Sequence, residues 1–244
     1  AFFSGFGFGP MIGGVLTEHF GMNTAFYSMA SLSLLAFFIV IFFLPETIQR
    51  KTEESHRLSF KEISQSSMVR GIFSIRLTQA LGRGGLITFL PIFAGVYLSL
   101  GTTLIGILIS INVLSMSLLA PLGGRIADRF GRRTLTILGN ILFLAGLAAI
   151  PLTHNFWQLL ALGLVQGFGG AISIPAATAL TVEEGRKYGM GSTMAVFVMA
   201  MSMGMTIGPI LSGIIADFIN VSSVFYFGAA IGLMGTSLFI WFTK

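Results

Sequence analysis

The sequence predicts an all-α integral membrane protein, and three observations lead to that fold class. Of its 244 residues, 54% are hydrophobic and only 9% are charged, whereas a soluble domain carries about 25% charged residues. The mean hydropathy is +0.89. Eight apolar stretches are each long enough to cross about 30 Å of hydrocarbon as a helix. These properties exclude a large soluble enzyme, a secreted disulfide scaffold and a disordered chain. Cysteine is absent, so no thiolate metal site is expected.

The eight predicted helices follow one another along the whole chain. They cover residues 1–18, 23–44, 69–97, 103–123, 134–152, 157–181, 191–215 and 222–243. The first is rich in glycine and lacks the basic segment of a signal peptide. The chain starts inside this apolar stretch at Ala1, so we expect it to be a fragment of a longer protein.

The connections between these helices alternate in charge. Those around 19–22, 98–102, 153–156 and 216–221 contain no Lys or Arg, whereas the others are basic. The basic residues of the second set are Arg50, Lys51, Arg57, Lys61, Arg70, Arg125, Arg129, Arg132, Arg133, Arg186 and Lys187. The positive-inside rule places this set in the cytoplasm of a cell-membrane protein, together with the C-terminus. The net charge of +5 then needs no nucleic-acid partner.

The longest polar connection covers residues 45–68. Ser59 followed by Glu62 has the pattern of a capping box before a short amphipathic turn. We expect a cytoplasmic linker with a small surface helix, and the alternative is a site of phosphorylation or partner binding.

An internal repeat indicates how many helices the intact protein has. A shift of 199 residues superposes GFGFGPMIGG at 5–14 on GMTIGPILSG at 204–213. Because the linker and four predicted helices separate the two copies, one repeat unit contains six helices. We therefore expect twelve helices in two halves. Residues 1–44 would be the last two helices of the first half, 45–68 the central linker, and 69–244 the complete second half.

The sequence GGRIADRFGRR at 123–133 resembles the cytoplasmic signature G-x-x-x-D-R-x-G-R-R of the major facilitator superfamily. The matching residues are Gly124, Asp128, Arg129, Gly131, Arg132 and Arg133. The resemblance implies the major facilitator fold over helices five to twelve. Charge-assisted contacts of Asp128 and its arginines could latch the two halves while the cytoplasmic side is closed. The alternative is that the arginines only set topology and bind anionic lipid.

The glycine-rich first helix looks like the fifth-helix signature of proton-coupled antiporters in that superfamily. Small residues in this pattern let helices approach closely, and proline bends a helix. We expect a hinge-like seam between the halves, and ordinary packing is the alternative. The expected seam residues are Gly5, Gly9, Pro10, Gly13 and Gly14, with Gly208, Pro209 and Gly213 in the second copy. The region 76–93 is loosely similar to the multidrug and sugar-efflux branches.

Two arginines lie within the third predicted helix. Arg76, Gln79 and Arg83 follow i, i+3, i+7 spacing, which places them on one helix face. Arg83 lies about 20 Å beyond Arg70 at 1.5 Å per residue, and an arginine at such depth faces the interior or a wet cavity. We expect Arg83 to line a substrate cavity and Arg76 to snorkel to the cytoplasm. The alternatives are snorkelling for Arg83 and a cavity role for Arg76.

Asn112 and Gln166 are further candidates for substrate binding, with interhelical hydrogen bonds as the alternative. Met199, Met201, Met203 and Met205 could provide adaptable ligand packing or ordinary apolar contacts. All nine Asp and Glu residues lie in connections or near helix ends, so any proton-coupling acid is expected in the missing helices. No spacing suggests a metal site, and we expect no cofactor.

These features favour a secondary transporter that exports a drug-like or sugar-like molecule in exchange for protons. We expect a monomer in the lipid bilayer. One alternative is a proton-coupled uptake symporter for a sugar or organic anion, for which Arg83 would be a suitable counter-ion. Another is a membrane sensor that transports nothing. An enzyme would need paired acids, a Ser–His pair or metal ligands within the helices, and the sequence has none there.

Overall fold

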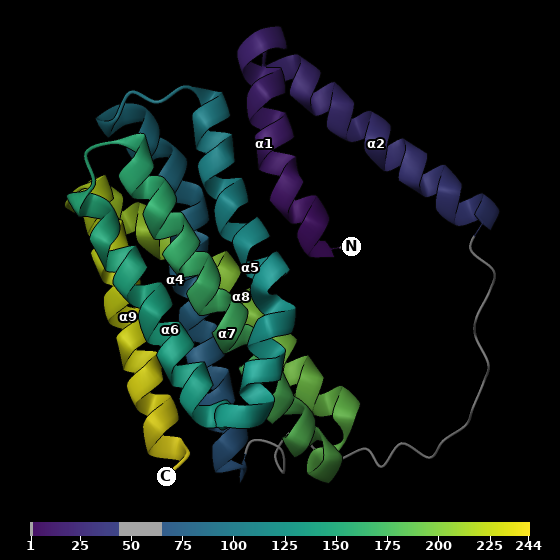
Figure 1. Ribbon diagram of the computed structural model, residues 1–244, viewed down its shortest axis with the longest axis vertical. Coiled ribbons are helices and arrows are strands. Elements are labelled where there is room, and N and C mark those ends of the chain that lie inside the picture. Colours follow the sequence, from purple (N-terminus) through teal and green to yellow (C-terminus); the bar gives the residue numbers. More distant parts are fainter. Residues whose placement is uncertain (1, 44–64) are drawn as a thin grey trace.

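The structure of the chain, a computed structural model, describes residues 2–43 and 65–244, with the side chains of all of these except residues 2–4 and Asp128. Most of the predicted linker, including Ser59 and Glu62, lies outside this range. The described part is helical throughout (Figure 1). Its elements are α1 (Phe2–Phe20), α2 (Met22–Phe43), α4 (Ser67–Tyr97), α5 (Thr102–Phe130), α6 (Arg132–Ala149), the 3-10 turn η1 (Ile150–Leu152), α7 (Phe156–Tyr188), α8 (Met190–Phe218) and α9 (Val221–Phe242).

All eight predicted helices are present in the described residues, and seven of them are long and apolar enough to cross a membrane. The exception is α1, because its glycines together with Glu18 and His19 lower its hydropathy. Polar groups of a backbone inside hydrocarbon must be bonded internally, and a helix does this within one segment. The chain is therefore a multi-pass helical membrane protein.

Several helices extend beyond the predicted apolar stretches at the end that carries the basic residues. We call this the basic end; it contains the start of α4, the α5–α6 and α7–α8 turns and the C-terminus, and it is lowest in Figure 1. The prediction of a loop at 123–133 was wrong, because α5 continues to Phe130. A single residue, Gly131, then separates α5 from α6. Its φ of +84° is one that a residue with a side chain rarely adopts, and Gly189 separates α7 from α8 in the same way with φ +88°.

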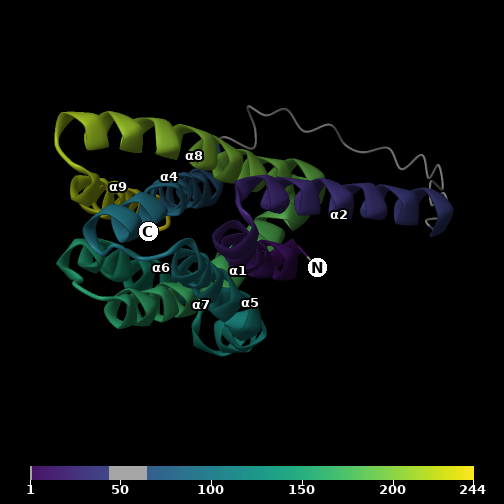
Figure 2. The same ribbon diagram turned by 90° about the horizontal axis from the view of Figure 1, so that it is seen from above.

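Helices α4 to α9 pack into one bundle, with α4 between α8 and α9 and with α7 against both α5 and α6. Its core contains the fully buried side chains of Phe143, Leu147 and Phe225. Helix α1 lies along α5, whereas α2 extends away from the bundle and contains no buried residue (Figures 1 and 2). The site described below therefore depends on the α4–α9 bundle and on α1.

The glycine-proline seam of α1 contacts α5, but through fewer of the predicted residues than expected. A Cβ atom added to Gly14 would lie 2.5 Å from the carbonyl oxygen of Thr102, and one added to Gly106 would collide with the carbonyl oxygen of Pro10. Gly7, which we did not predict, approaches Leu114 as closely. In contrast, no described atom lies within 4 Å of such a Cβ on the three remaining glycines. These are Gly5, Gly9 and Gly13.

The second copy of this motif packs against α4. A Cβ atom on Gly208 would collide with the carbonyl oxygen of Leu81, and Pro209 lies within 2.9 Å of the position of a Cβ on Gly84. Gly213 makes only ordinary contact, 3.9 Å from Phe89. Within the described residues this seam thus joins two helices of the 69–244 region. A seam between the halves stays a prediction for this second copy, because the glycine pattern shows which face is small but not which helices pack on it.

Candidate functional site

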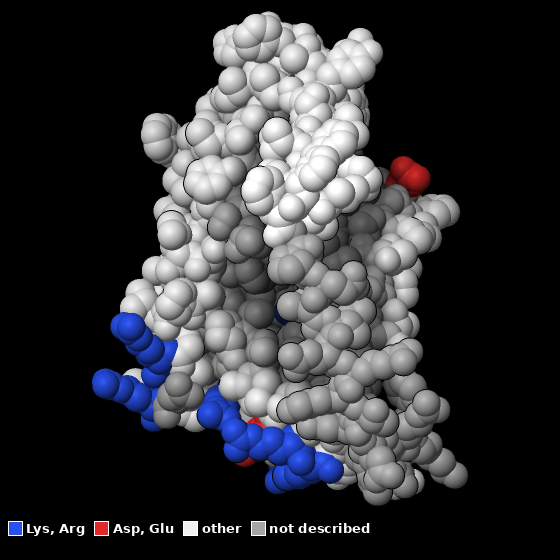
Figure 3. Space-filling model, turned by 90° about the vertical axis from the view of Figure 1, so that its right-hand side faces the viewer, with Lys and Arg blue, Asp and Glu red and all other residues white. Residues whose placement is uncertain are grey.

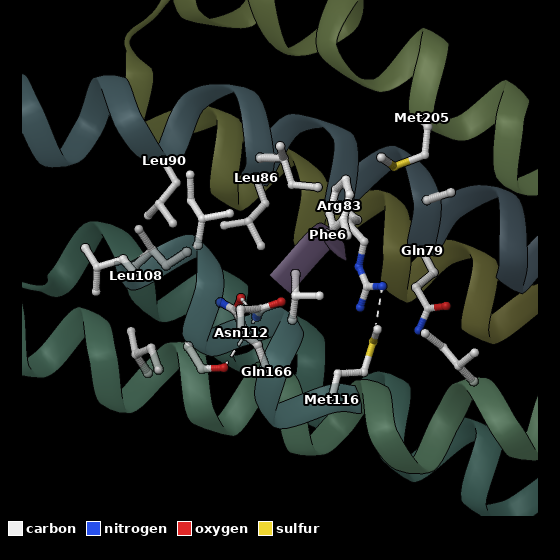
Figure 4. Close-up of a pocket in the computed structure, with 18 of the residues that line it drawn as sticks. Phe6, Gln79, Arg83, Leu86, Leu90, Leu108, Asn112, Met116, Gln166 and Met205 are labelled. Atoms are coloured by element: carbon white, nitrogen blue, oxygen red, sulfur yellow. Dashed lines mark hydrogen bonds between the residues drawn. The ribbon is translucent and has the colours of Figure 1, made fainter. Parts of the chain in front are cut away.

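A cavity of about 320 Å³ lies halfway along the bundle. Helices α4, α5, α7 and α8 supply most of its wall, and Phe6 of α1 contributes to it (Figure 4). All four residues predicted to bind substrate line it, namely Gln79, Arg83, Asn112 and Gln166. Seen from the side, the molecule has a deep hollow with basic atoms inside it (Figure 3). The structure thus brings together residues from three helices, α4, α5 and α7.

Arg76 also lines this cavity, which corrects the expectation that it snorkels to the cytoplasm. Its side chain is only 8% exposed. Nη1 donates a hydrogen bond to Oε1 of Gln79 at 2.9 Å, and Nη2 donates to the sulfur of Met201 at 3.1 Å. The guanidinium carbon also lies 4.7 Å from the centre of the Phe197 ring. Because α8 covers the face of α4 that carries Arg76, the guanidinium is held inside the bundle.

Arg83 is one of the most deeply placed charges in the described part of the chain. It lies about 24 Å from the start of α4 and about 21 Å from its end, at 1.5 Å per residue. Its guanidinium carbon is 5.3 Å from the centre of the Phe143 ring, and Nη1 donates to the sulfur of Met116 at 3.4 Å. The residue as a whole is partly exposed to the cavity, yet Nε and Nη2 are buried and have no hydrogen-bond partner among the described residues. Sulfur is a weak acceptor, so this charge is poorly compensated.

Asn112 and Gln166 lie opposite Arg83 in the cavity wall (Figure 4). The Asn112 amide donates hydrogen bonds to Oε1 of Gln166 at 3.1 Å and to the carbonyl oxygen of Gly163 at 3.4 Å. Both the interhelical bond and the cavity position that we weighed for these residues are therefore present. Met201 and Met205 also line the cavity, whereas Met199 and Met203 are exposed.

A second cavity of about 620 Å³ adjoins the first on the side of the basic end. Met116 and Ile174 line both cavities. From there the second cavity extends between α5 and α7 to Arg132, Glu183 and Arg186. The two cavities together lead from the centre of the bundle towards its basic end.

The residues of the predicted cytoplasmic gate lie at the basic end, where lysine and arginine side chains gather (Figure 3). Nη1 of Arg132 lies 3.3 Å from Oε2 of Glu183, and both side chains are exposed. Nη2 of Arg133 donates to the carbonyl oxygen of Ile240 near the end of α9, at 3.2 Å. The side chain of Arg129 is exposed, and a Cβ on Gly124 would have no described atom within 4 Å. The side chain of Asp128, on which the latch prediction depends, lies outside the described residues.

Two carboxylates make contacts that the sequence did not reveal. Oε2 of Glu18, at the end of α1, accepts a hydrogen bond of 2.8 Å from the backbone N–H of Thr103 and one of 3.3 Å from the Thr102 hydroxyl. It thereby caps the start of α5. Glu184 is 7% exposed and accepts hydrogen bonds from the Ser66 hydroxyl at 3.1 Å and from Lys187 at 2.8 Å. Lys187 lies three residues after Glu184 in the same helix, whereas Ser66, Thr102 and Thr103 lie far away in the sequence, so no local pattern indicates those contacts.

A helical membrane bundle with a charged cavity at half depth has the architecture of a transport protein. The family model of the Major Facilitator Superfamily matches residues 72–244, and the chain belongs to this superfamily of transporters. Within the described residues, no group of three or more His, Asp or Glu side chains could hold a metal ion.

Several curated relatives are similar to the chain. An uncharacterized MFS-type transporter of Methanocaldococcus jannaschii is 26% identical over 94% of this chain and 61% of its own length. The multidrug resistance protein MdtG of Proteus mirabilis is 25% identical over 91% of this chain and 57% of its own length. The quinolone resistance protein NorA of Staphylococcus aureus is 26% identical over 63% of this chain and 39% of its own length. The chain thus spans at most about three fifths of the length of these relatives.

Proposed function

We propose that this protein is part of a twelve-helix secondary transporter of the cell membrane, which exports a small molecule in exchange for protons by alternating access. Residues 1–44 would complete the first six-helix half, 45–68 would link the halves in the cytoplasm, and 69–244 would form the second half. The internal repeat and the greater length of the relatives support this arrangement. The basic end would face the cytoplasm, in accordance with the positive-inside rule.

The central cavity carries the proposal. It lies at half depth between α4, α5 and α7, and a second cavity extends from it towards the basic end. Binding near the bilayer midplane with access to one side at a time is the principle of alternating access. The cavity volume is at the lower end of the range of about 300–1,000 Å³ that is usual for small-molecule sites. Multidrug and quinolone resistance proteins among the relatives favour export of an amphipathic molecule.

Proton-coupled uptake is the second candidate, and the basic cavity is the observation that favours it. Arg76 and Arg83 line the cavity, while no Asp or Glu does so among the described lining residues. Such a site suits import of an organic anion with a proton. The direction of coupling therefore has to be measured.

The test uses the full-length protein in inverted membrane vesicles with an acidic lumen and a trapped pH-sensitive dye. Ethidium and a quinolone, added outside, are the first probes. Export by antiport carries the probe inward and protons outward, so we expect the lumen to become more alkaline only in vesicles that contain the protein. Movement of probe and protons in the same direction would establish the symporter. Absence of flux for any compound that binds would favour the sensor.

A further inference from the structure

The unsatisfied polar atoms that line the central cavity are all hydrogen-bond donors. They are Nε of Arg76, Nε and Nη2 of Arg83, and Nε2 of Gln166. The remaining buried atoms without a partner in the described part of the chain belong to Thr103, Ser110 and Asn140, none of which lines this cavity. A buried donor without a partner destabilises the protein by the full desolvation cost of that group. The unpaired buried atoms of the described residues that line the cavity are thus donors, and none of them is an acceptor.

The two unsatisfied nitrogens of Arg83 lie on one edge of its guanidinium group. The Nε–H and Nη2–H bonds of an arginine point in the same direction, and their spacing matches the two oxygens of a carboxylate. Nη1 points elsewhere and donates to Met116. Nη2 lies 3.1 Å from the position that a Cβ on Gly170 would occupy, so the guanidinium packs closely on the backbone of Gly170, where a larger residue would be crowded. Neighbouring atoms thus cover this edge, although the residue as a whole is partly exposed to the cavity.

Apart from its few polar residues the cavity wall is apolar, and no carboxylate among the described residues of the wall compensates the charge of the two arginines. Leu86, Leu90, Leu108, Val113 and Leu159 form a large part of the surface. Two guanidinium groups in such surroundings need an opposite charge, because an ion in a medium of low dielectric constant is strongly destabilised. Among the described residues that line the cavity, none is acidic.

We propose that the central cavity binds an amphipathic carboxylate, with the carboxylate group beside the guanidinium of Arg83 and the apolar body against the leucines. This inference rests on the proposed function, since it assigns a substrate class to the same cavity. Arg76 adds positive charge, and the unused amide donor of Gln166 provides a further contact for a polar substituent. The competing possibility is that a carboxylate of the protein itself, from outside the described residues, neutralises Arg83.

The test compares three fluorescent probes on the purified full-length protein. Dansylglycine carries a carboxylate, dansylglycinamide is its neutral counterpart, and dansylethylenediamine carries an amine. We expect the carboxylate to bind at least about tenfold more tightly than the amide, because hydrogen bonds to a charged group contribute about 1.5–3 kcal/mol, or about 10- to 100-fold in affinity. Equal affinity for acid and amide in the unmodified protein would overturn the proposal and favour an internal carboxylate.

Variants locate the contact. Arg83→Gln should remove the preference for the carboxylate over the amide, and Arg83→Lys should restore only part of it because lysine lacks the planar guanidinium. Arg70→Gln is the matched control: Arg70 lies on the same helix, stacks over Phe242 at the basic end and does not line the cavity. A preference that survives Arg83→Gln would refute the assigned contact.

The vesicle assay keeps the two proposals distinguishable. If ethidium drives proton release but the acid and amide bind alike, the export function stands and the carboxylate site fails. If the carboxylate binds selectively and no compound moves protons, the site stands and proton exchange fails.

Discussion

The seam between α1 and α5 gives a prediction that distinguishes the effect of observed contacts from the effect of position in the sequence motif. Gly9 occupies the centre of the motif, but no described atom lies within 4 Å of a Cβ added there. A Cβ on Gly14 would lie 2.5 Å from the backbone oxygen of Thr102. Atoms in van der Waals contact are about 3.5 Å apart, so the two backbones would have to separate by about 1 Å. We therefore expect Gly14→Ala and Gly9→Ala to have opposite effects.

The magnitudes follow from helix propensity and overpacking. Alanine stabilises a helix interior by up to about 1 kcal/mol relative to glycine, and Gly9→Ala adds no close contact with any described residue. Overpacking costs about 1–3 kcal/mol, and the upper value applies at Gly14 because a backbone oxygen cannot rotate away. The net effect of Gly14→Ala is then a loss of about 2 kcal/mol, and the two variants differ by about 3 kcal/mol.

Thermal unfolding of the 244-residue chain in detergent, followed by size-exclusion chromatography of a fluorescent fusion, measures this difference. At about 2–4 °C per kcal/mol for domains of 150–250 residues, the Tm values should be about 6 °C or more apart, with Gly9→Ala at or above the unmodified protein. Gly106→Ala tests the seam from the side of α5 and should behave like Gly14→Ala. If Gly9→Ala lowers Tm as much as Gly14→Ala, the reasoning from contacts is wrong, and the effect of a substitution depends on its position in the motif.

Three further predictions concern other parts of the molecule. Thr236→Val removes the buried acceptor of a 2.8 Å hydrogen bond from Asn140, so we expect a loss of about 1–3 kcal/mol, seen as a lower Tm; an unchanged Tm would mean that Asn140 finds another partner. Glu18→Ala removes the cap of α5 and should cost about 1 kcal/mol, whereas Glu18→Gln keeps an acceptor oxygen and should cost less; the order of the two Tm values is the test. A cysteine at Thr102 should react with an impermeant thiol reagent added to intact cells, whereas a cysteine at Ser55 should react only in inverted vesicles, and labelling at 55 in intact cells would reverse the proposed orientation.

The sequence predicted the helices and one face of α4 because both depend on local spacing. Hydropathy over about 20 residues identifies a span, and i, i+3, i+7 spacing places Arg76, Gln79 and Arg83 on one side whatever lies opposite. The burial of the Arg76 side chain depends on a different helix. Phe197 and Met201 of α8 cover it, and no pattern in α4 indicates that α8 lies there.

The remaining differences have the same origin. Gly7 and Gly14 are in close contact while Gly5, Gly9 and Gly13 are not, because the partner helix selects one face of a segment that is small on every side. The signature at 123–133 is polar enough to suggest a loop, yet α5 remains helical to Phe130 because solvent-exposed arginine is compatible with a helix. Contacts between helices far apart in the sequence therefore determine which glycines are in close contact, and local composition does not reveal them.

The two one-residue turns at Gly131 and Gly189 constrain how the bundle can move. Each joins a pair of helices, α5 with α6 and α7 with α8, through a single backbone position. A connection this short holds the adjoining helix ends at a fixed separation, so at the basic end each pair must be displaced as a unit. Within the α4–α9 bundle the links at the opposite end are longer, with Leu98–Gly101 between α4 and α5, residues 150–155 between α6 and α7, and residues 219–220 between α8 and α9. Any opening of the second cavity at the basic end is then a tilt of whole hairpins about their glycine corners, and a longer insert at either glycine would uncouple the two arms of that hairpin.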